Sequence, residues 1–289
     1  MTTLLLHGLG ADRRQPLELF GPILAESGER VIAIDVRAHG TDERVGRAQD
    51  FAIDRLADEI AASVRETDAS GARLATDDPL VRAAADPGHD APATAAGAAG
   101  PARAATPLTV IGISMGAAIA LRLALHRLLP IERAVFVRPS FDDRSMPPNL
   151  RVFPVIGQLL HDAGAEGGLA EFRESTRYQA FARETPAGAK GLLSQFTAPR
   201  AAERAIRLVE VPRNRAFTDD AELAGLAARG IRSLVVAAPR DPVHPFELGE
   251  RWAGALGAPL ERVPARDDGL AAQTAKLHES VAAWLTATR

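Results

Sequence analysis

Short apolar runs alternate with amphipathic segments along most of this chain. The apolar runs predict strands at residues 3–6, 30–36, 108–113, 133–137, 231–238 and 260–263. In the run at 30–36 the apolar residues are continuous rather than alternating with polar ones, which is typical of a parallel sheet covered on both faces. Between them, apolar residues recur at helical spacing, as in the stripe over residues 51–64. The pattern therefore predicts an α/β fold, with a mostly parallel sheet, flanking helices and right-handed connections.

Two long segments interrupt this alternation. Residues 66–106 are rich in Ala, Gly, Pro and Asp and show no apolar period, so we expect a disordered or loosely held insertion there. Residues 140–226 contain apolar positions at helical spacing and no strand pattern, which predicts an inserted helical cap. The expected organisation is a core of residues 1–139 and 227–289, with the flexible insertion at 66–106 and the cap at 140–226.

The third predicted strand ends in a glycine-rich motif, Gly112-Ile113-Ser114-Met115-Gly116. A strand, G-x-S-x-G and a helix in this order predict a nucleophile elbow, a tight turn that lifts a serine hydroxyl into a cleft. The two glycines have a steric reason, because a side chain at either would collide with the neighbouring strand or with the helix. A glycine-rich turn that holds a structural serine is the alternative interpretation.

Together these features resemble the α/β-hydrolase family, in its serine-nucleophile branch with a helical cap. The resemblance covers nearly the whole chain and rests on His7-Gly8, on Asp35-x-Arg37-x-His39-Gly40, on the elbow, and on Arg240-Asp241-Pro242-Val243-His244-Pro245. None of these motifs is specific to a substrate. The first two strands of the family are missing, which leaves the strand at 30–36 on the sheet edge. We hypothesise that a homodimer contact or the 66–106 insertion covers that edge.

The resemblance also implies catalytic roles. Ser114 corresponds to the nucleophile and Asp241 to the catalytic acid, while the main-chain amides of Leu9 and Met115 would form the oxyanion hole. One element of the family pattern is absent. The catalytic histidine normally lies on the loop after the last strand, but here that loop reads Pro264-Ala-Arg-Asp-Asp-Gly269.

The base must therefore be sought among other histidines. A serine hydroxyl needs a base within hydrogen-bond reach, and histidine exchanges a proton near pH 7. His244 is the first candidate, because it follows Asp241 by three residues on a loop that leaves a parallel strand. His278 is the alternative base, since it completes the order Ser, Asp, His, although it falls well inside the last predicted helix. His7 and His39 are expected to be structural, and a structural role in a Pro-bracketed turn is the other interpretation of His244.

Composition and charge restrict the partners and the chemistry that fit this chain. The net charge is −3 with no basic block, which argues against nucleic acid as a partner. The chain has no cysteine, which excludes disulfides, cysteine catalysis and thiolate metal sites. No apolar run reaches membrane-spanning length, and the chain starts inside a predicted strand. We expect a cytoplasmic protein with no membrane partner, no metal and no cofactor.

Two functions from different classes fit this sequence. The first is a serine hydrolase that cleaves an ester-type bond of a small-molecule acyl substrate, a lactone or thioester included, through an acyl-enzyme at Ser114. The second is a non-catalytic binding protein that has kept the α/β-hydrolase fold but has lost its catalytic histidine.

Overall fold

A parallel sheet forms the centre of the molecule. The computed structural model describes residues 1–70 and 107–289, and within them six strands pair in the order β2-β1-β3-β4-β5-β6, all parallel. The strands are β1 (Thr2–Leu6), β2 (Arg30–Ile34), β3 (Leu108–Ile113), β4 (Ile131–Val137), β5 (Arg232–Ala237) and β6 (Leu260–Arg262). The predicted fold class is confirmed, and β2 lies on the sheet edge as the missing strands require.

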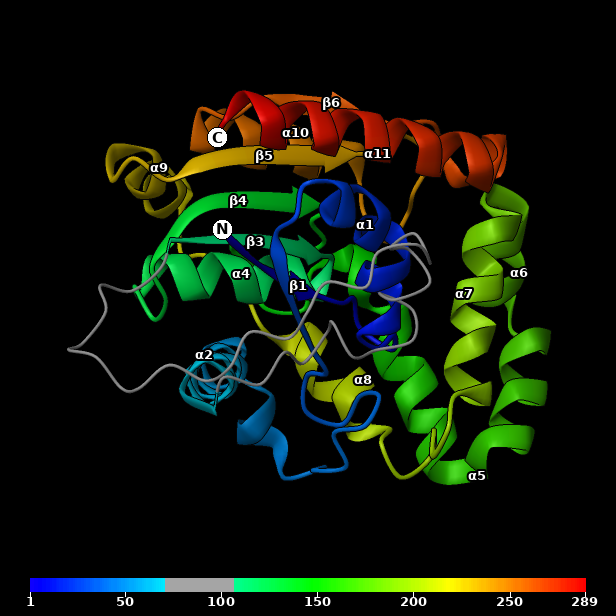
Figure 1. The fold of residues 1–289 in the computed structure, drawn as a ribbon. Coiled ribbons are helices and arrows are strands. Elements are labelled where there is room, and N and C mark those ends of the chain that lie inside the picture. The colour runs from blue at the N-terminus through cyan, green and yellow to red at the C-terminus, as the bar shows by residue number, and fades with distance from the viewer. Residues whose placement is uncertain (71–106) are drawn as a thin grey trace, which may run out of the picture.

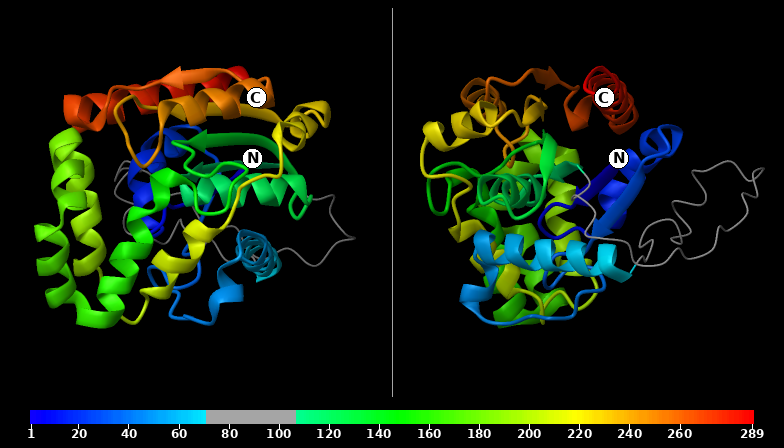
Figure 2. Two further views of the ribbon diagram at one scale, coloured as in Figure 1. Left: turned by 180° about the vertical axis from the view of Figure 1, so that it is seen from behind. Right: turned by 60° about the vertical axis from the view of Figure 1, so that its left-hand side comes forward.

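Helices cover both faces of this sheet. Along β1, Leu5 packs on one face, against α1 (Arg14–Glu26) and α11 (Leu270–Ala287), whereas Leu4 and Leu6 pack on the other. The second face is covered by α2 (Ile53–Ser70), α4 (Met115–Leu125), α9 (Asp220–Ala228) and α10 (Phe246–Leu256). The right-hand view of Figure 2 shows the two helical layers on either side of the strands. This two-sided burial explains why five of the six strands contain a short apolar run.

Between β4 and β5 the chain forms further helices, α5 (Val152–Glu174), α6 (Thr176–Glu184), α7 (Pro186–Thr197) and α8 (Ile206–Glu210). Helices α5, α6 and α7 pack against one another, beyond the end of the sheet to which the strand arrows point (Figure 1). The remaining short 3-10 helices are η1 (Ala48–Phe51), η2 (Pro148–Leu150), η3 (Val211–Arg213) and η4 (Arg266–Asp268). No strand occurs between residues 140 and 226, all of which the structure describes. The division of the chain into a core and a separate cap stays a prediction.

The sequence-predicted insertion lies almost entirely outside the described residues. Its first five residues, 66–70, belong to α2, which is longer than the apolar stripe of residues 51–64 predicts. Among residues 1–70 and 107–289, no helix has the length and apolar content needed to cross a membrane.

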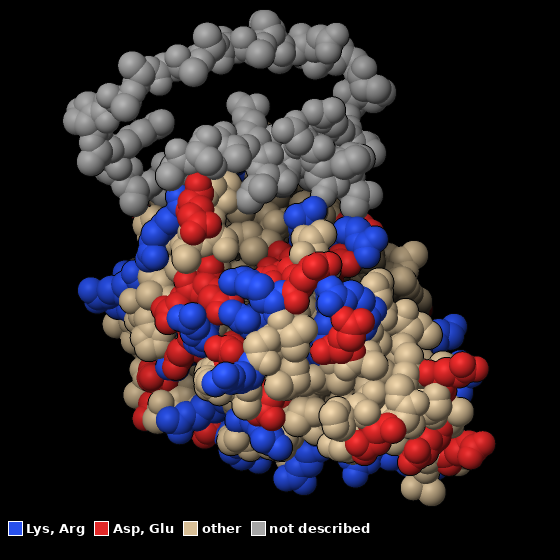
Figure 3. Space-filling view, turned by 90° about the horizontal axis from the view of Figure 1, so that it is seen from below, with Lys and Arg blue, Asp and Glu red and all other residues tan. Residues whose placement is uncertain are grey.

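The charged residues are mixed in sign. Figure 3 shows basic and acidic side chains interspersed over one face, with no large field of a single sign. Several of the arginines lie in ion pairs, with Arg37 Nη2 at 2.6 Å from Glu59 Oε1 and Arg251 Nη1 at 2.8 Å from Asp143 Oδ1. Pairing of this kind cancels much of the field that a nucleic-acid-binding surface needs.

Candidate active site

The turn after β3 holds Ser114 in a strained backbone conformation. Its φ is 54° and its ψ −109°, a region that residues other than glycine rarely occupy. The glycines on either side make this turn possible. A Cβ at Gly112 would lie 2.7 Å from the main-chain nitrogen of Ala117, and one at Gly116 would lie 2.8 Å from the His7 carbonyl oxygen. Strand, turn and helix therefore follow one another as the motif predicts, and the strain is located at the residue predicted to act.

Ser114 lines a cavity of about 190 Å³ at the carboxyl ends of the strands. Asp241, His244 and Leu9 line the same cavity, so the fold brings together four site residues from three distant parts of the sequence. Apolar side chains form much of its wall: Phe141, Leu150, Phe153, Phe181 and Leu192. Most of these come from the helices inserted between β4 and β5. The cavity thus joins polar groups at the sheet edge to an apolar wall, the usual composition of a small-molecule site.

His244 and Asp241 form a hydrogen-bonded pair on the loop after β5. The ring Nδ1 of His244 lies 2.9 Å from Asp241 Oδ2, and the other carboxylate oxygen accepts main-chain N–H groups of Val243 and His244, each at 3.2 Å. An ionised carboxylate can only accept, so the shared proton belongs to Nδ1. The Nε2 atom of His244 is then left with a free lone pair, which is the state that a general base requires.

Arg138, which follows β4, contacts both members of this pair. Its Nη2 donates to Asp241 Oδ2 at 2.6 Å, and it also lies 2.9 Å from His244 Nδ1, to which it cannot donate while that nitrogen carries the proton. Burial by itself would raise the pKa of Asp241, but the charges of His244 and Arg138 hold that pKa well below its usual range. Burial lowers the pKa of His244, Asp241 opposes this change, and Arg138 adds to it. The result is an ionised aspartate beside an imidazole that is neutral at physiological pH.

The hydroxyl of Ser114 is hydrogen-bonded to a second serine. The Oγ atoms of Ser114 and Ser140 are 2.9 Å apart, and Ser140 is fully buried. Asn149 holds this region to the histidine loop, since its Nδ2 donates to the carbonyls of Ser140 at 2.9 Å and Val243 at 2.7 Å. In the described residues no hydrogen bond joins Ser114 to a histidine. A hydroxyl can both donate and accept, so the contact with Ser140 does not by itself fix the direction of the Ser114 O–H.

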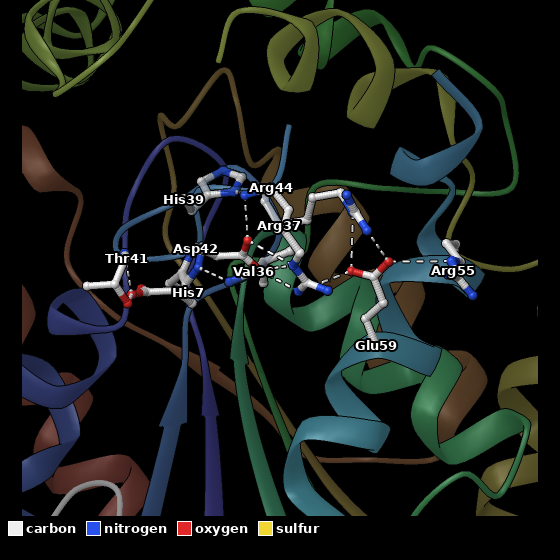
Figure 4. Close-up of polar contacts among 10 residues, drawn as sticks. His7, Val36, Arg37, His39, Thr41, Asp42, Arg44, Arg55 and Glu59 are labelled. Carbon is white, nitrogen blue, oxygen red and sulfur yellow. Dashed lines mark hydrogen bonds and ion pairs between the residues drawn. The ribbon is translucent and has the colours of Figure 1, made fainter. Parts of the chain in front are cut away.

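Two buried histidines shape the loop after β1. His7 Nε2 accepts the main-chain N–H of Val36 at 3.0 Å, while its Nδ1 donates to the Gly8 carbonyl at 2.9 Å. His39 Nε2 accepts the N–H of Gly10 at 3.1 Å, and its Nδ1 donates to a main-chain carbonyl at 2.8 Å. Figure 4 shows one main-chain contact of each ring, between His7 and Val36 and between His39 and Arg37. Burial lowers the pKa of each ring, so both are neutral and occupied in holding the loop.

The same loop carries an unpaired amide next to the nucleophile. A Cβ at Gly8 would lie 3.5 Å from Ser114 Cβ, so the loop passes directly beside the serine. Gly8 donates its N–H to Gln15 Oε1 at 2.8 Å, whereas the N–H of Leu9 has no partner in the described part of the chain. The N–H of Met115, the first residue of α4, also has none there. These are the two amides that the sequence predicts as oxyanion donors.

His278 lies elsewhere. It is the ninth residue of α11 and is absent from the cavity lining, and its Nε2 is buried without a hydrogen-bond partner. The structure therefore does not bring the alternative base to Ser114. Across residues 1–70 and 107–289, no cluster of three or more His, Asp or Glu side chains has the arrangement of a metal site.

Three polar residues at the site escaped the sequence reasoning. Arg138, Ser140 and Arg266 all line the cavity. Each lies just after a predicted strand, where a parallel sheet places its ligand-binding loops. Their position just after the strand ends could therefore have identified them as site residues, whereas their residue types alone could not.

This fold and site define the class of the protein. The model of the alpha/beta hydrolase family matches residues 3–271, and the chain belongs to that family. A search of curated proteins found no match.

Solved structures of this family resemble the chain at low sequence identity. A thermophilic esterase from Thermogutta terrifontis with malate bound is 16% identical, with a TM-score of 0.62 over 99% of this chain and 89% of the esterase. MenH from S. aureus is 14% identical, with a TM-score of 0.62 over 99% and 92% of the two chains. An esterase from Exiguobacterium antarcticum is 19% identical, with a TM-score of 0.56 over 91% and 82%. At these identities the likeness shows the fold.

Proposed function

We propose that this protein is a serine hydrolase that cleaves a small carboxylic ester through an acyl-enzyme at Ser114. The observation that carries the proposal is one shared cavity. A serine on a strained elbow, a histidine hydrogen-bonded to an ionised aspartate, and a loop with an unpaired amide all line it. These are the parts that acyl transfer to water requires.

In this mechanism Ser114 Oγ bonds to the substrate carbonyl carbon while its proton passes to His244 Nε2. The carbonyl electron pair moves onto oxygen, and the amides of Leu9 and Met115 hold the resulting oxyanion. The intermediate collapses, the bond to the leaving alkoxide breaks, and the alkoxide takes the proton from His244. Water then attacks the acyl-enzyme with His244 again as base, and Ser114 recovers its proton as the acid leaves. Asp241 keeps the proton on Nδ1 throughout.

A fluorophosphonate probe tests the nucleophile directly. Such probes phosphonylate only serines that a neighbouring base activates, so we expect a single labelled peptide containing Ser114. Prior heat unfolding is the control, because it removes the activating geometry and must abolish labelling. Absence of labelling on the folded protein over pH 6–9 would contradict the proposal.

The pH dependence follows from the His244 pKa. The base acts when it is neutral, so kcat/KM should fall as the pH decreases through that pKa. Because burial lowers the pKa of His244, we expect the midpoint of this acid limb below pH 6.5, in ester hydrolysis measured from pH 4.5 to 8.5. Arg138 adds to the lowering, so Arg138→Gln should move the limb to higher pH. The exposed Arg240 lies outside the cavity, and Arg240→Gln should leave the limb in place.

A limb midpoint at or above pH 6.5 in the unmodified protein would contradict this assignment. So would an equal shift in both arginine variants, which would indicate a general change of charge rather than a local effect on the imidazole.

Two observations favour the non-catalytic alternative. The Ser114 hydroxyl bonds to Ser140 and the loop after β6 has no histidine, so the cavity could serve binding without turnover. Under that alternative the protein resists the fluorophosphonate probe, yet a small ligand still binds in the cavity, which calorimetric titration would detect. The probe experiment therefore separates the two functions.

A further inference from the structure

Arg266 lies at the place where the family pattern has its histidine. It follows β6, opens the short helix η4, and lines the cavity together with Ser114 and His244. Its guanidinium extends toward the inserted helices, since its Nη1 would lie 3.8 Å from a Cβ on Gly191 of α7. The family's base position thus carries a permanent cation that forms part of the substrate cavity.

The guanidinium of Arg266 has no partner of its own. It makes no hydrogen bond or ion pair within residues 1–70 and 107–289, and its Nε is fully buried. The acidic side chains around it are all engaged elsewhere: Asp241 by Arg138 and His244, Asp267 by Thr185 and the Ala187 amide, and Asp268 by Arg240. The protein leaves this cation free.

The charge of the cavity is therefore unbalanced. Its charged lining consists of two guanidinium groups, Arg138 and Arg266, and one carboxylate, Asp241. Repulsion from Arg138 and burial lower the pKa of Arg266 to about 10, which still leaves it protonated at neutral pH. Arg138 is matched by Asp241, so one positive charge is left over. A partly buried charge without a counter-ion is unfavourable, and a ligand with a single negative charge would neutralise it.

We propose, building on the proposed function, that Arg266 binds a carboxylate of the substrate, so that the ester cleaved at Ser114 is an anionic one. The planar fork of a guanidinium matches a carboxylate with two parallel hydrogen bonds. A phosphate dianion fits less well, because its second charge would have no cation to match and would face Asp241. The aromatic and leucine side chains of the wall suit the aliphatic part of the same molecule. The cavity volume of about 190 Å³ restricts it to a small ester.

Two matched pairs of esters test this proposal, one for each side of the scissile bond. The first pair is mono-4-nitrophenyl glutarate and the neutral 4-nitrophenyl valerate, and the second is butyryl glycolate and its carboxamide. The quantity measured is the ratio of kcat/KM for the anionic over the neutral member at pH 8. We expect this ratio to be about 10 or more in at least one pair, the size typical of a charge-assisted hydrogen bond.

Variants of Arg266 should change that ratio in a graded way. Arg266→Gln should bring it to about 1, Arg266→Glu should reverse the preference by like-charge repulsion, and Arg266→Lys should retain only part of it. Arg44→Gln is the matched control, since it removes the same charge from an exposed side chain outside the cavity whose carboxylate partner, Asp42, does not lie beside Arg266 in the chain, and it should keep the original ratio. Because each ratio is taken within one variant, effects on His244 or on folding cancel.

Failure of this inference can be told apart from failure of the proposed function. If neutral esters are cleaved but neither anionic ester is preferred, or if Arg266→Gln keeps the preference, the carboxylate site is wrong and the hydrolase stands. If no ester is cleaved, calorimetric titration with valerate against valeramide decides. Tighter binding of valerate that Arg266→Gln abolishes supports the site without catalysis, and equal binding of the two overturns it.

Discussion

Replacing Ser114 with alanine is expected to lower kcat/KM for any ester that the protein cleaves by about 10⁴-fold or more. In the proposed mechanism the hydroxyl oxygen of Ser114 forms the bond to the acyl carbon, and the alanine variant lacks it. The measurement is hydrolysis of a chromogenic ester at several enzyme concentrations, since the residual rate must scale with the enzyme. The same variant should lose all fluorophosphonate labelling.

A glycine at the same position separates catalysis from stability. Ser114 has a φ of 54°, where a residue with a Cβ is strained by about 1–3 kcal/mol, whereas glycine is not. The greater freedom of glycine in the unfolded chain offsets part of this gain. Ser114→Gly should therefore be as inactive as the alanine variant but more stable than it by about 1 kcal/mol in denaturant unfolding.

Either of two results would count against this view of the elbow. Retention of more than about one hundredth of the activity by both variants would remove Ser114 as the nucleophile. A glycine variant less stable than the alanine variant would show that the turn is not strained as its φ and ψ indicate.

The local pattern of apolar residues and glycines along the sequence was enough to predict the sheet and the elbow. Five of the six strands contain a short apolar run between helical segments, as burial on both faces favours, whereas β6 reads Leu-Glu-Arg and is not fully buried. The G-x-S-x-G motif predicts its own backbone because Gly112 and Gly116 are required by contacts within a few residues or with the adjacent strand. His7 and His39 could be predicted as structural side chains for a similar reason, because each lies in a main-chain turn that its own ring contacts.

The long-range parts of the site could not be derived in this way. Ser140 meets Ser114 only because β4 pairs beside β3, and Arg138 reaches Asp241 only because β5 pairs beside β4. The availability of the Arg266 charge to a ligand becomes apparent only when the acidic side chains around it are seen to be paired with other groups. Such facts depend on which loops the sheet order brings together, and a single sequence carries that information weakly.

The choice between the two candidate bases follows from the same topology. His244 leaves the carboxyl end of β5 and lines the cavity, whereas His278 lies in the middle of α11 and does not. For His278 to reach Ser114, the first two turns of that helix would have to unwind, which would break the hydrogen bond from Gln273 Nε2 to the Pro264 carbonyl at 2.8 Å. The resting structure offers no reason for this.

His244→Gln is therefore expected to lower kcat/KM by about 10³-fold or more, while His278→Gln should change it by less than about twofold. Glutamine keeps much of the volume and polarity of the imidazole but cannot exchange a proton near pH 7. The pH profile distinguishes loss of the base from a displaced loop. Without the imidazole the acid limb should disappear, and the residual rate should rise in proportion to hydroxide, because solvent hydroxide is then the remaining base. The reverse outcome, with His278→Gln inactive and His244→Gln retaining its acid limb, would assign the base to α11 and require that helix to open during turnover.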